Sequence, residues 1–150
     1  MLRKEENSVQ GLVSIVMPAY NVGDYIDESI RSVQAQTYTN WELLIVDDCS
    51  TDDTVDKIKT FMGDTRIKFL QNERNSGAAI SRNYALREAN GKWVAFLDAD
   101  DVWLPEKIEQ QLTFMIQNGY KFCYTDYRIR LNGEWKPYIN TGPKIVTKRK

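Results

Sequence analysis

The sequence contains no histidine and only two cysteines among its 150 residues. Without histidine, serine–histidine triads, histidine-rich zinc sites and imidazole bases are excluded, so acid–base chemistry must be carried by carboxylates. Cys49 and Cys123 can pair only if the fold happens to bring them together, and we expect free thiols in a reducing compartment. Cys49 has no neighbouring base or cation that would generate a thiolate, which argues against a cysteine nucleophile.

Long apolar runs and an excess of charge of one sign are also lacking. No stretch approaches the roughly 20 apolar residues of a membrane span, and the first residues lack the apolar core of a signal peptide. Lys and Arg number 20 against 21 Asp and Glu, so there is no basic footprint for nucleic acid. We expect a cytoplasmic protein. Basic residues near the end allow peripheral contact with the inner face of a membrane, the alternative being a solvated terminus. They are Lys144, Lys148, Arg149 and Lys150.

Two glycine-rich phosphate-binding motifs are missing as well. No G-x-G-x-x-G follows the first predicted strand, which argues against a dinucleotide-dependent dehydrogenase. No G-x-x-x-x-G-K-[ST] occurs in the chain, which excludes a P-loop nucleotide hydrolase.

What the sequence does contain is a regular alternation of strand and helix patterns. Short apolar runs predict strands at residues 12–17, 41–46, 66–70 and 92–97. We expect Pro18 to end the first strand, because proline cannot extend a ladder. A C-terminal hairpin is predicted from strands at 121–130 and 134–138, joined by the turn dipeptide Asn132-Gly133.

Apolar residues at helical spacing predict the intervening helices. These lie at residues 24–36, 77–89 and 105–119, with Gly91 ending the second of them. A further helix is expected after a capping box formed by Ser50 and Asp53. Its apolar face consists of Val55, Ile58 and Met62.

This order predicts an α/β fold with a mostly parallel, Rossmann-like sheet and helices on both faces. We expect one domain at residues 12–140, between an N-terminal tail at 1–11 and a tail at 141–150. The last residues contain no capped end, and we expect a truncated chain whose natural form continues beyond Lys150.

An acidic cluster follows the apolar run at residues 94–97. That run has no polar alternation, which predicts a strand covered on both faces. Asp98, Asp100 and Asp101 then crowd the carboxyl end of the strand, where open α/β sheets bind ligands. Their mutual repulsion favours a hard cation, Mg²⁺ or Mn²⁺, shared with a diphosphate. The alternative is that Asp100 and Asp101 merely cap the turn before the next helix.

Two other loops are expected at the same edge, at residues 18–21 and 47–48, so that three loops line one crevice. Asp48 is a candidate acceptor of hydrogen bonds from a base or ribose, or else a turn residue. Tyr20 is a candidate for stacking on a base, or else packs in the core. Arg82 is placed to reach a phosphate, or else is a solvated helix residue.

With these residues assembled, the chain resembles the glycosyltransferase family 2 domain, which has the GT-A fold. The resemblance runs from about Val13 to Tyr127 and lies in four blocks in the family's order and spacing. The blocks are VSIVMPAYN at 13–21, ELLIVDDCSTD at 42–52, NSG at 75–77 with SRN at 81–83, and FLDADD at 96–101.

The resemblance implies a nucleotide-sugar-binding domain that uses Mn²⁺ or Mg²⁺. Asp98 and Asp100 match the D-x-D motif, with Asp100 the direct metal ligand. Asp48 matches the acceptor from uracil, and Arg82 the arginine that approaches the nucleotide. The implied substrate contacts are Pro18, Ala19, Tyr20, Asp48, Arg82, Asp98 and Ala99.

The implied reaction is metal-dependent transfer of a sugar from a nucleoside diphosphate, UDP in our interpretation, to an acceptor hydroxyl with inversion. It would serve polysaccharide or glycoconjugate synthesis on a saccharide or lipid-linked acceptor. The family's carboxylate base would lie beyond Lys150. Two alternatives stay open: a non-catalytic nucleotide-sugar-binding fragment, and a phosphatase of the haloacid dehalogenase type. The phosphatase carries its D-x-D after the first strand, whereas here the motif follows the fourth.

Overall fold

The structure, a computed structural model, describes residues 11–131 and 134–136. The chain divides into two units, with the boundary between Thr113 and Phe114. The N-terminal tail up to residue 10 and the tail at 141–150 lie outside the described residues.

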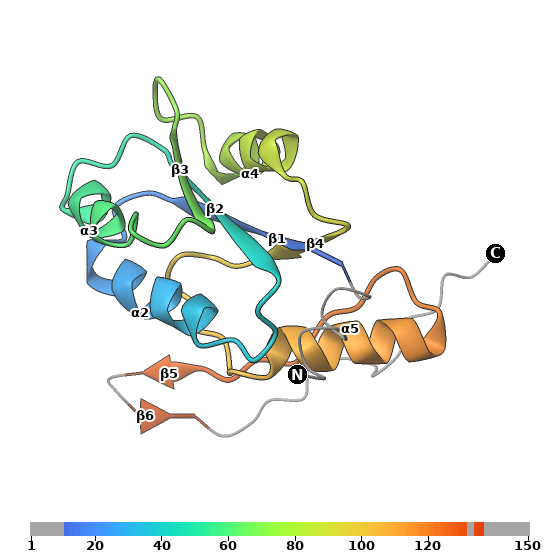
Figure 1. The fold of residues 1–150 in the computed structure, drawn as a ribbon. Coiled ribbons are helices and arrows are strands. Elements are labelled where there is room, and N and C mark those ends of the chain that lie inside the picture. The colour runs from blue at the N-terminus through green and yellow to red at the C-terminus, as the bar shows by residue number, and fades with distance from the viewer. Residues whose placement is uncertain (1–10, 132–133, 137–150) are drawn as a thin grey trace. The chain divides into compact units, whose positions relative to one another are not determined.

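The first unit is built on a parallel sheet of four strands. These are β1 (Val13–Ala19), β2 (Trp41–Asp47), β3 (Ile67–Gln71) and β4 (Trp93–Phe96), in the order β3-β2-β1-β4. Between them run α2 (Gly23–Gln34), α3 (Thr54–Thr60) and α4 (Ala78–Glu88), and α5 (Lys107–Asn118) begins in this unit. In Figure 1, α4 lies on one face of the sheet, and α2 and α3 lie on the other. The predicted parallel α/β architecture is confirmed.

The two central strands supply most of the core. Every residue of β2 is buried, and in β1 only Pro18 is partly exposed. Val16, Leu44 and Val46 pack with Ala85 of α4 in one cluster. Each large apolar side chain buried in this way contributes about 1.5–3 kcal/mol. The small side chain of the alanine allows α4 to lie close to the sheet.

The prediction that Pro18 ends the first strand was wrong, since β1 continues to Ala19. Successive residues of a central parallel strand direct their backbone groups to alternate neighbours. The Val16 carbonyl accepts from Leu97 N–H at 3.1 Å on the β4 side, and the Ala19 carbonyl accepts from Asp48 N–H at 2.8 Å on the β2 side. Pro18 therefore faces the β4 side, where pairing has already ended, and its missing N–H costs no ladder hydrogen bond.

The strand before the acidic cluster is not covered on both faces, as its apolar run had predicted. β4 lies at the edge of the sheet, and its side chains alternate in exposure. Val94 and Phe96 are exposed, whereas Leu97, just after the strand, is buried. An uninterrupted apolar run does not distinguish a central strand from an edge strand with one open face.

The expected helix boundaries differ from the structure at three points, the start and end of α3 and the end of α4. Ser50 and Asp53 form no capping box, because Asp53 makes no side-chain cap hydrogen bond and the Ser50 hydroxyl accepts from Asn21 N–H instead. Met62 lies beyond the end of α3 and is exposed. α4 ends at Glu88 without using Gly91 as its cap.

Gly91 is required for a different reason. A Cβ atom at this position would lie 2.5 Å from the backbone nitrogen of Ser14. The glycine therefore allows the chain entering β4 to approach β1 closely.

The second unit contains much less strand than predicted. β5 (Arg130–Leu131) and β6 (Glu134–Trp135) form an antiparallel pair, so the hairpin is confirmed. Residues 122–129 are not strand, and most of their side chains are exposed. A β-prone segment becomes a strand only where it finds a partner to pair and pack with. The turn dipeptide Asn132-Gly133 and the predicted strand end at Tyr138 lie outside the described residues.

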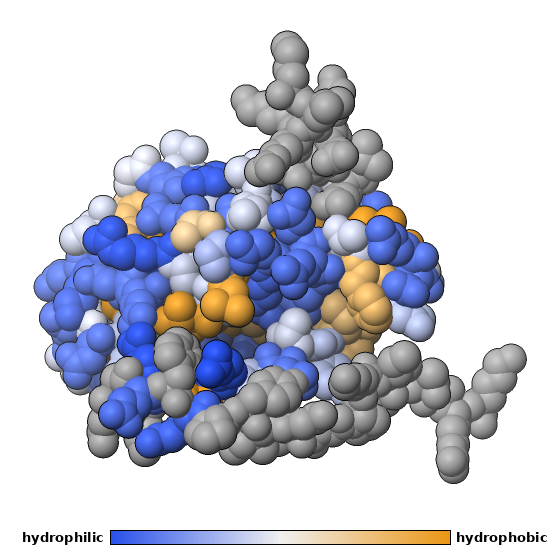
Figure 2. Space-filling model, turned by 90° about the horizontal axis from the view of Figure 1, so that it is seen from below, coloured by the Kyte–Doolittle hydropathy of each residue, from blue (hydrophilic) through white to orange (hydrophobic). Residues whose placement is uncertain are grey.

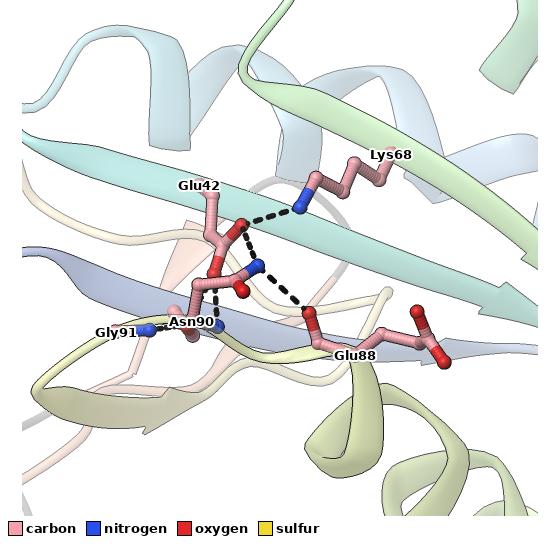
Figure 3. Close-up of polar contacts among 6 residues, drawn as sticks. Glu42, Lys68, Glu88, Asn90 and Gly91 are labelled. Carbon is pink, nitrogen blue, oxygen red and sulfur yellow. Dashed lines mark hydrogen bonds and ion pairs between the residues drawn. The ribbon is translucent and has the colours of Figure 1, made fainter.

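A buried carboxylate ties the sheet together at its amino edge (Figure 3). Glu42 of β2, only 6% exposed, accepts hydrogen bonds from the Ser14 hydroxyl at 2.6 Å, Lys68 Nζ at 2.8 Å and the Asn90 N–H at 2.7 Å. Burial by itself raises the pKa of Glu42, but the hydrogen bonds from Lys68, Ser14 and Asn90 outweigh it and lower the pKa to about 2. Glu42 thus joins β1, β2, β3 and the segment leading into β4.

Hydrophobic surface is dispersed on the face drawn in Figure 2. Hydrophilic residues predominate there, and hydrophobic residues are visible in small separate groups. No helix among residues 11–131 has both the length and the apolar character needed to cross a membrane.

Candidate functional site

A cavity of about 270 Å³ opens at the carboxyl edge of the sheet. It is formed by the loops that follow β1, β2 and β4, together with the first turns of α4. Its lining residues are Pro18, Ala19, Tyr20, Val22, Asp48, Ala78, Ser81, Arg82, Asp98, Ala99 and Asp100. The structure thus brings every site residue predicted from the sequence to one cavity. Tyr20 is half exposed there rather than packed in the core.

Successive side chains of the acidic loop alternate between exposed and buried positions. Asp98 and Asp100 are exposed, while Ala99 between them is 3% exposed. A turn closes the loop, with Asp101 N–H donating to the Asp98 carbonyl at 2.9 Å. Partial burial raises the pKa of Asp101, and the charges of Asp100 and Asp98 raise it further. This repulsion was expected from the sequence, and it leaves the loop receptive to a cation.

Arg82 of α4 neutralises part of this charge. Its Nη2 lies 2.5 Å from Asp98 Oδ1, in an ion pair whose side chains are 35% and 53% exposed. At that exposure an ion pair contributes on the order of 0–1 kcal/mol, so a stronger ligand can displace it. The Asp100 carboxylate has no hydrogen-bond donor among the described residues.

Asp48 is a turn residue, one of the two alternatives considered from the sequence, and it also lines the cavity. Its nearly buried carboxylate accepts from Asn72 Nδ2 at 2.7 Å, Ser76 N–H at 2.8 Å and Gly77 N–H at 2.7 Å. Burial raises its pKa, but these three donors outweigh that effect and lower it. Asp48 therefore fixes the turn that leads into α4 and is held as an anion. Three donors leave a carboxylate with acceptor capacity to spare.

Its neighbour Asp47 is turned away from the cavity. Asp47 is fully buried and accepts from Gln71 Nε2 at 3.0 Å and from Ser50 N–H at 3.2 Å. Cys49, the next residue but one, has φ +63°. Glycine tolerates that backbone conformation best, so a cysteine at this position is in a less favourable conformation.

The sequence analysis missed Asn72. Its amide donates to Asp48 and, at 2.9 Å, to the Ser81 hydroxyl, so it links the loop after β3 to the cavity wall. A signal was available, since Asn72 directly follows a parallel strand at the carboxyl edge, as the other site residues do. Trp103, just after the acidic loop, is buried and does not line the cavity.

The acidic loop fits a divalent cation only in part. Among the described residues, no group of three or more acidic, cysteine or histidine side chains is placed to enclose a metal. Mg²⁺, however, is commonly held by one or two carboxylates together with substrate phosphates and water. Asp98 and Asp100 supply such carboxylates, and the unpartnered Asp100 is the better placed. The residues fit a metal whose coordination is completed by a diphosphate.

Comparisons with known proteins find similar proteins among glycosyltransferases. WfgD of Escherichia coli, a UDP-Glc:alpha-D-GlcNAc-diphosphoundecaprenol beta-1,3-glucosyltransferase, is 51% identical over 79% of the chain and 46% of its own length. TuaG of Bacillus subtilis (strain 168), a putative teichuronic acid biosynthesis glycosyltransferase, is 47% identical over 79% of the chain and 47% of its own. The chain spans about half the length of these curated relatives.

The chain is also similar to solved structures of glycosyltransferases. S. aureus TarS in complex with UDP-GlcNAc superposes with a TM-score of 0.68 at 34% identity, over 71% of this chain and 32% of that one. The mannosyltransferase PcManGT from Pyrobaculum calidifontis, in complex with GDP-Man and Mn²⁺, superposes with a TM-score of 0.58 at 29% identity, over 61% and 28%.

The family model for glycosyl transferase family 2 matches residues 14–149. That range contains the whole parallel sheet except Val13, and all of the residues that line the cavity. One assignment follows from the alternation of strands and helices, the clustered aspartates and the relatives. The chain belongs to glycosyl transferase family 2 and has the GT-A fold of glycosyltransferases.

Proposed function

We propose that the chain is the donor-binding part of an enzyme that transfers a sugar from UDP to a hydroxyl group of a lipid-linked saccharide. The observation that carries this proposal is the convergence of Asp48, Arg82, Asp98 and Asp100 on one cavity from separate loops and a helix. The names of WfgD and TuaG support a role in building a cell-surface polysaccharide. A lipid-linked acceptor would bring the reaction to a membrane surface, and the inner face is the location we propose.

In this proposal each side chain has a distinct task. Tyr20 lies against the face of the base. Asp48, already fixed by three donors, accepts a further hydrogen bond from uracil. Arg82 exchanges Asp98 for a phosphate oxygen, since the exposed pair with Asp98 contributes only on the order of 0–1 kcal/mol and the metal would take over the Asp98 carboxylate.

Asp98 and Asp100 are the residues that would hold the metal ion. When bound, Mn²⁺ or Mg²⁺ supplies positive charge that stabilises the departing diphosphate. The acceptor hydroxyl would attack from the opposite face of the sugar and invert its anomeric centre. The carboxylate that removes its proton would belong to the acceptor side of the enzyme.

The first prediction tests whether donor binding requires a metal. Calorimetry should show that UDP binds the chain about 100-fold more tightly with Mn²⁺ than with a chelator, because two aspartates facing a diphosphate repel it without a cation. Equal affinities in the two buffers would contradict the proposed metal site. Binding without turnover by a protein as long as the relatives would instead indicate a non-catalytic module.

The second prediction concerns Arg82. Changing Arg82→Ala should weaken UDP binding in Mn²⁺ about fivefold to tenfold, as expected for the loss of a hydrogen bond between charged groups at a partly exposed site. Arg87→Ala, an exposed arginine of the same helix that does not line the cavity, is the matched control. An Arg82 variant that binds UDP as well as the Arg87 variant does would remove Arg82 from the site.

A further inference from the structure

One side of α2 carries a row of buried polar residues. Ser29, Ser32 and Gln36 recur at positions i, i+3 and i+7, which places them on one side of the helix and its continuation. They are 0%, 7% and 4% exposed. We call these three residues the α2 polar row. Buried hydroxyl and amide groups cost free energy unless they are hydrogen-bonded, so their partners show what the row does.

Ser29 contacts the backbone of the acidic loop directly. Its hydroxyl lies 2.8 Å from the Ala99 carbonyl oxygen and 2.6 Å from the Asp101 carbonyl oxygen, and its single O–H is shared between the two acceptors. These two carbonyls flank Asp100. A single buried hydroxyl therefore fixes the backbone on both sides of the carboxylate best placed to hold a metal.

The other members of the row hold the segment that follows. Ser32 Oγ accepts from Trp103 N–H at 3.1 Å. Gln36 donates through Nε2 to the Leu104 carbonyl at 2.8 Å and accepts at Oε1 from Ile108 N–H at 3.1 Å. The row thus follows the chain continuously from the acidic loop to the first turns of α5.

The acidic loop has few other anchors. Pairing of β4 with β1 ends at Phe96, and the next backbone hydrogen bond to the sheet is made by Leu97 N–H. Within the loop, the turn from Asp101 N–H to the Asp98 carbonyl is local and exposed to solvent at both aspartates. Arg82 also holds Asp98 in an exposed ion pair, but beyond Leu97 the buried hydrogen bonds to the backbone of the loop come from α2.

We propose that Ser29 is a positioning residue, which holds the Asp98–Asp101 loop in the shape that presents the Asp100 carboxylate to the cavity. The consequence for ligand binding rests on the proposed function, whereas the effect on the loop itself does not. Ser29 touches no ligand and acts only through the backbone on either side of Asp100.

The test compares two buried serines that differ in location. Ser29→Ala removes the hydroxyl beneath the acidic loop. Ser14→Ala removes an equally buried hydroxyl at the opposite edge of the sheet, where Ser14 donates to Glu42 and accepts from Gly91 N–H. Both variants lose hydrogen bonds in the interior, so a purely structural cost should affect both.

Two measurements are made on each variant of the 150-residue chain. The first is amide hydrogen exchange at Asp101 and Trp103, followed by NMR relative to the Ile45 amide in the core. The second is the affinity for UDP, measured by calorimetry with Mn²⁺ and with a chelator. We expect Ser29→Ala to speed exchange at both loop amides about tenfold and to weaken Mn²⁺-dependent UDP binding about tenfold. Ser14→Ala should change neither.

Each outcome decides the proposal. Unchanged exchange at the loop amides of Ser29→Ala overturns it, and so does faster exchange without loss of UDP affinity when the parent chain binds UDP with Mn²⁺. Equal effects in Ser14→Ala would show a general structural cost and would also overturn it. If the parent chain shows no Mn²⁺-dependent binding, the proposed function fails, and the exchange data alone decide whether Ser29 positions the loop.

Discussion

Changing Asp100→Ala is expected to reduce UDP affinity in Mn²⁺ to the value measured with a chelator, a loss of about 100-fold. Asp100 faces the cavity and has no hydrogen-bond donor among the described residues, so it has no structural task to lose. A carboxylate that binds a metal directly contributes several kcal/mol, far more than a surface ion pair. Calorimetry with and without metal measures the effect.

The control for this change is Asp56→Ala, which removes the same charge from an exposed position on α3. It should bind UDP as the parent chain does. In a protein as long as the curated relatives, Asp100→Ala should abolish sugar transfer without changing the circular dichroism spectrum. Undiminished transfer would withdraw the assignment of Asp100 to the metal.

The second large effect is expected on stability, at the other edge of the sheet. Glu42→Gln should lower the free energy of unfolding at pH 7 by about 2–4 kcal/mol. An amide in place of the carboxylate turns an NH₂ group toward donors, since Lys68, Ser14 and Asn90 all donate to Glu42. Urea unfolding measures the loss. The matched control is Glu88→Gln, because only the backbone carbonyl of Glu88 joins this network and its side chain is directed away (Figure 3).

The same carboxylate gives the protein a stability that depends on pH. The pKa of Glu42 is lowered in the folded protein from 4.5 to about 2, so its contribution is complete above about pH 4.5 and is lost as the pH falls toward 2. A shift of this size corresponds to about 3 kcal/mol. The difference in stability between the parent chain and Glu42→Gln should therefore shrink across this window. A constant difference would contradict the pKa assigned to Glu42.

Much of the fold could be predicted because local patterns determine it. The apolar runs of β1 and β2 and the helical spacing in α2 belong to segments that are buried where the pattern requires it. The rule that parallel strands share a carboxyl edge then brought Asp48 and Asp100 to one cavity without any knowledge of side-chain packing.

The errors have a common physical origin in contacts between distant parts of the chain. Phe96 is exposed because β4 lies at an edge of the sheet. An apolar run does not specify the position of its strand in the sheet. Ser50 resembles a cap but bonds Asn21, which lies 29 residues away. Ser29 looks like an ordinary helix residue until its hydroxyl is seen beneath a loop 70 residues further on.

The proline in β1 has a consequence for where the cavity can form. The chain places β2 and β3 successively on one side of β1 and then crosses to lay β4 on the other, so the direction of winding reverses between β1 and β4. Loops leaving two such strands depart toward opposite faces and open a crevice between them. Pro18 lies on the side of β1 that faces β4. Because it has no N–H, it cannot extend the pairing of β1 with β4. Pro18 thereby leaves β1 and β4 unpaired at the cavity, where the donor is expected to lie.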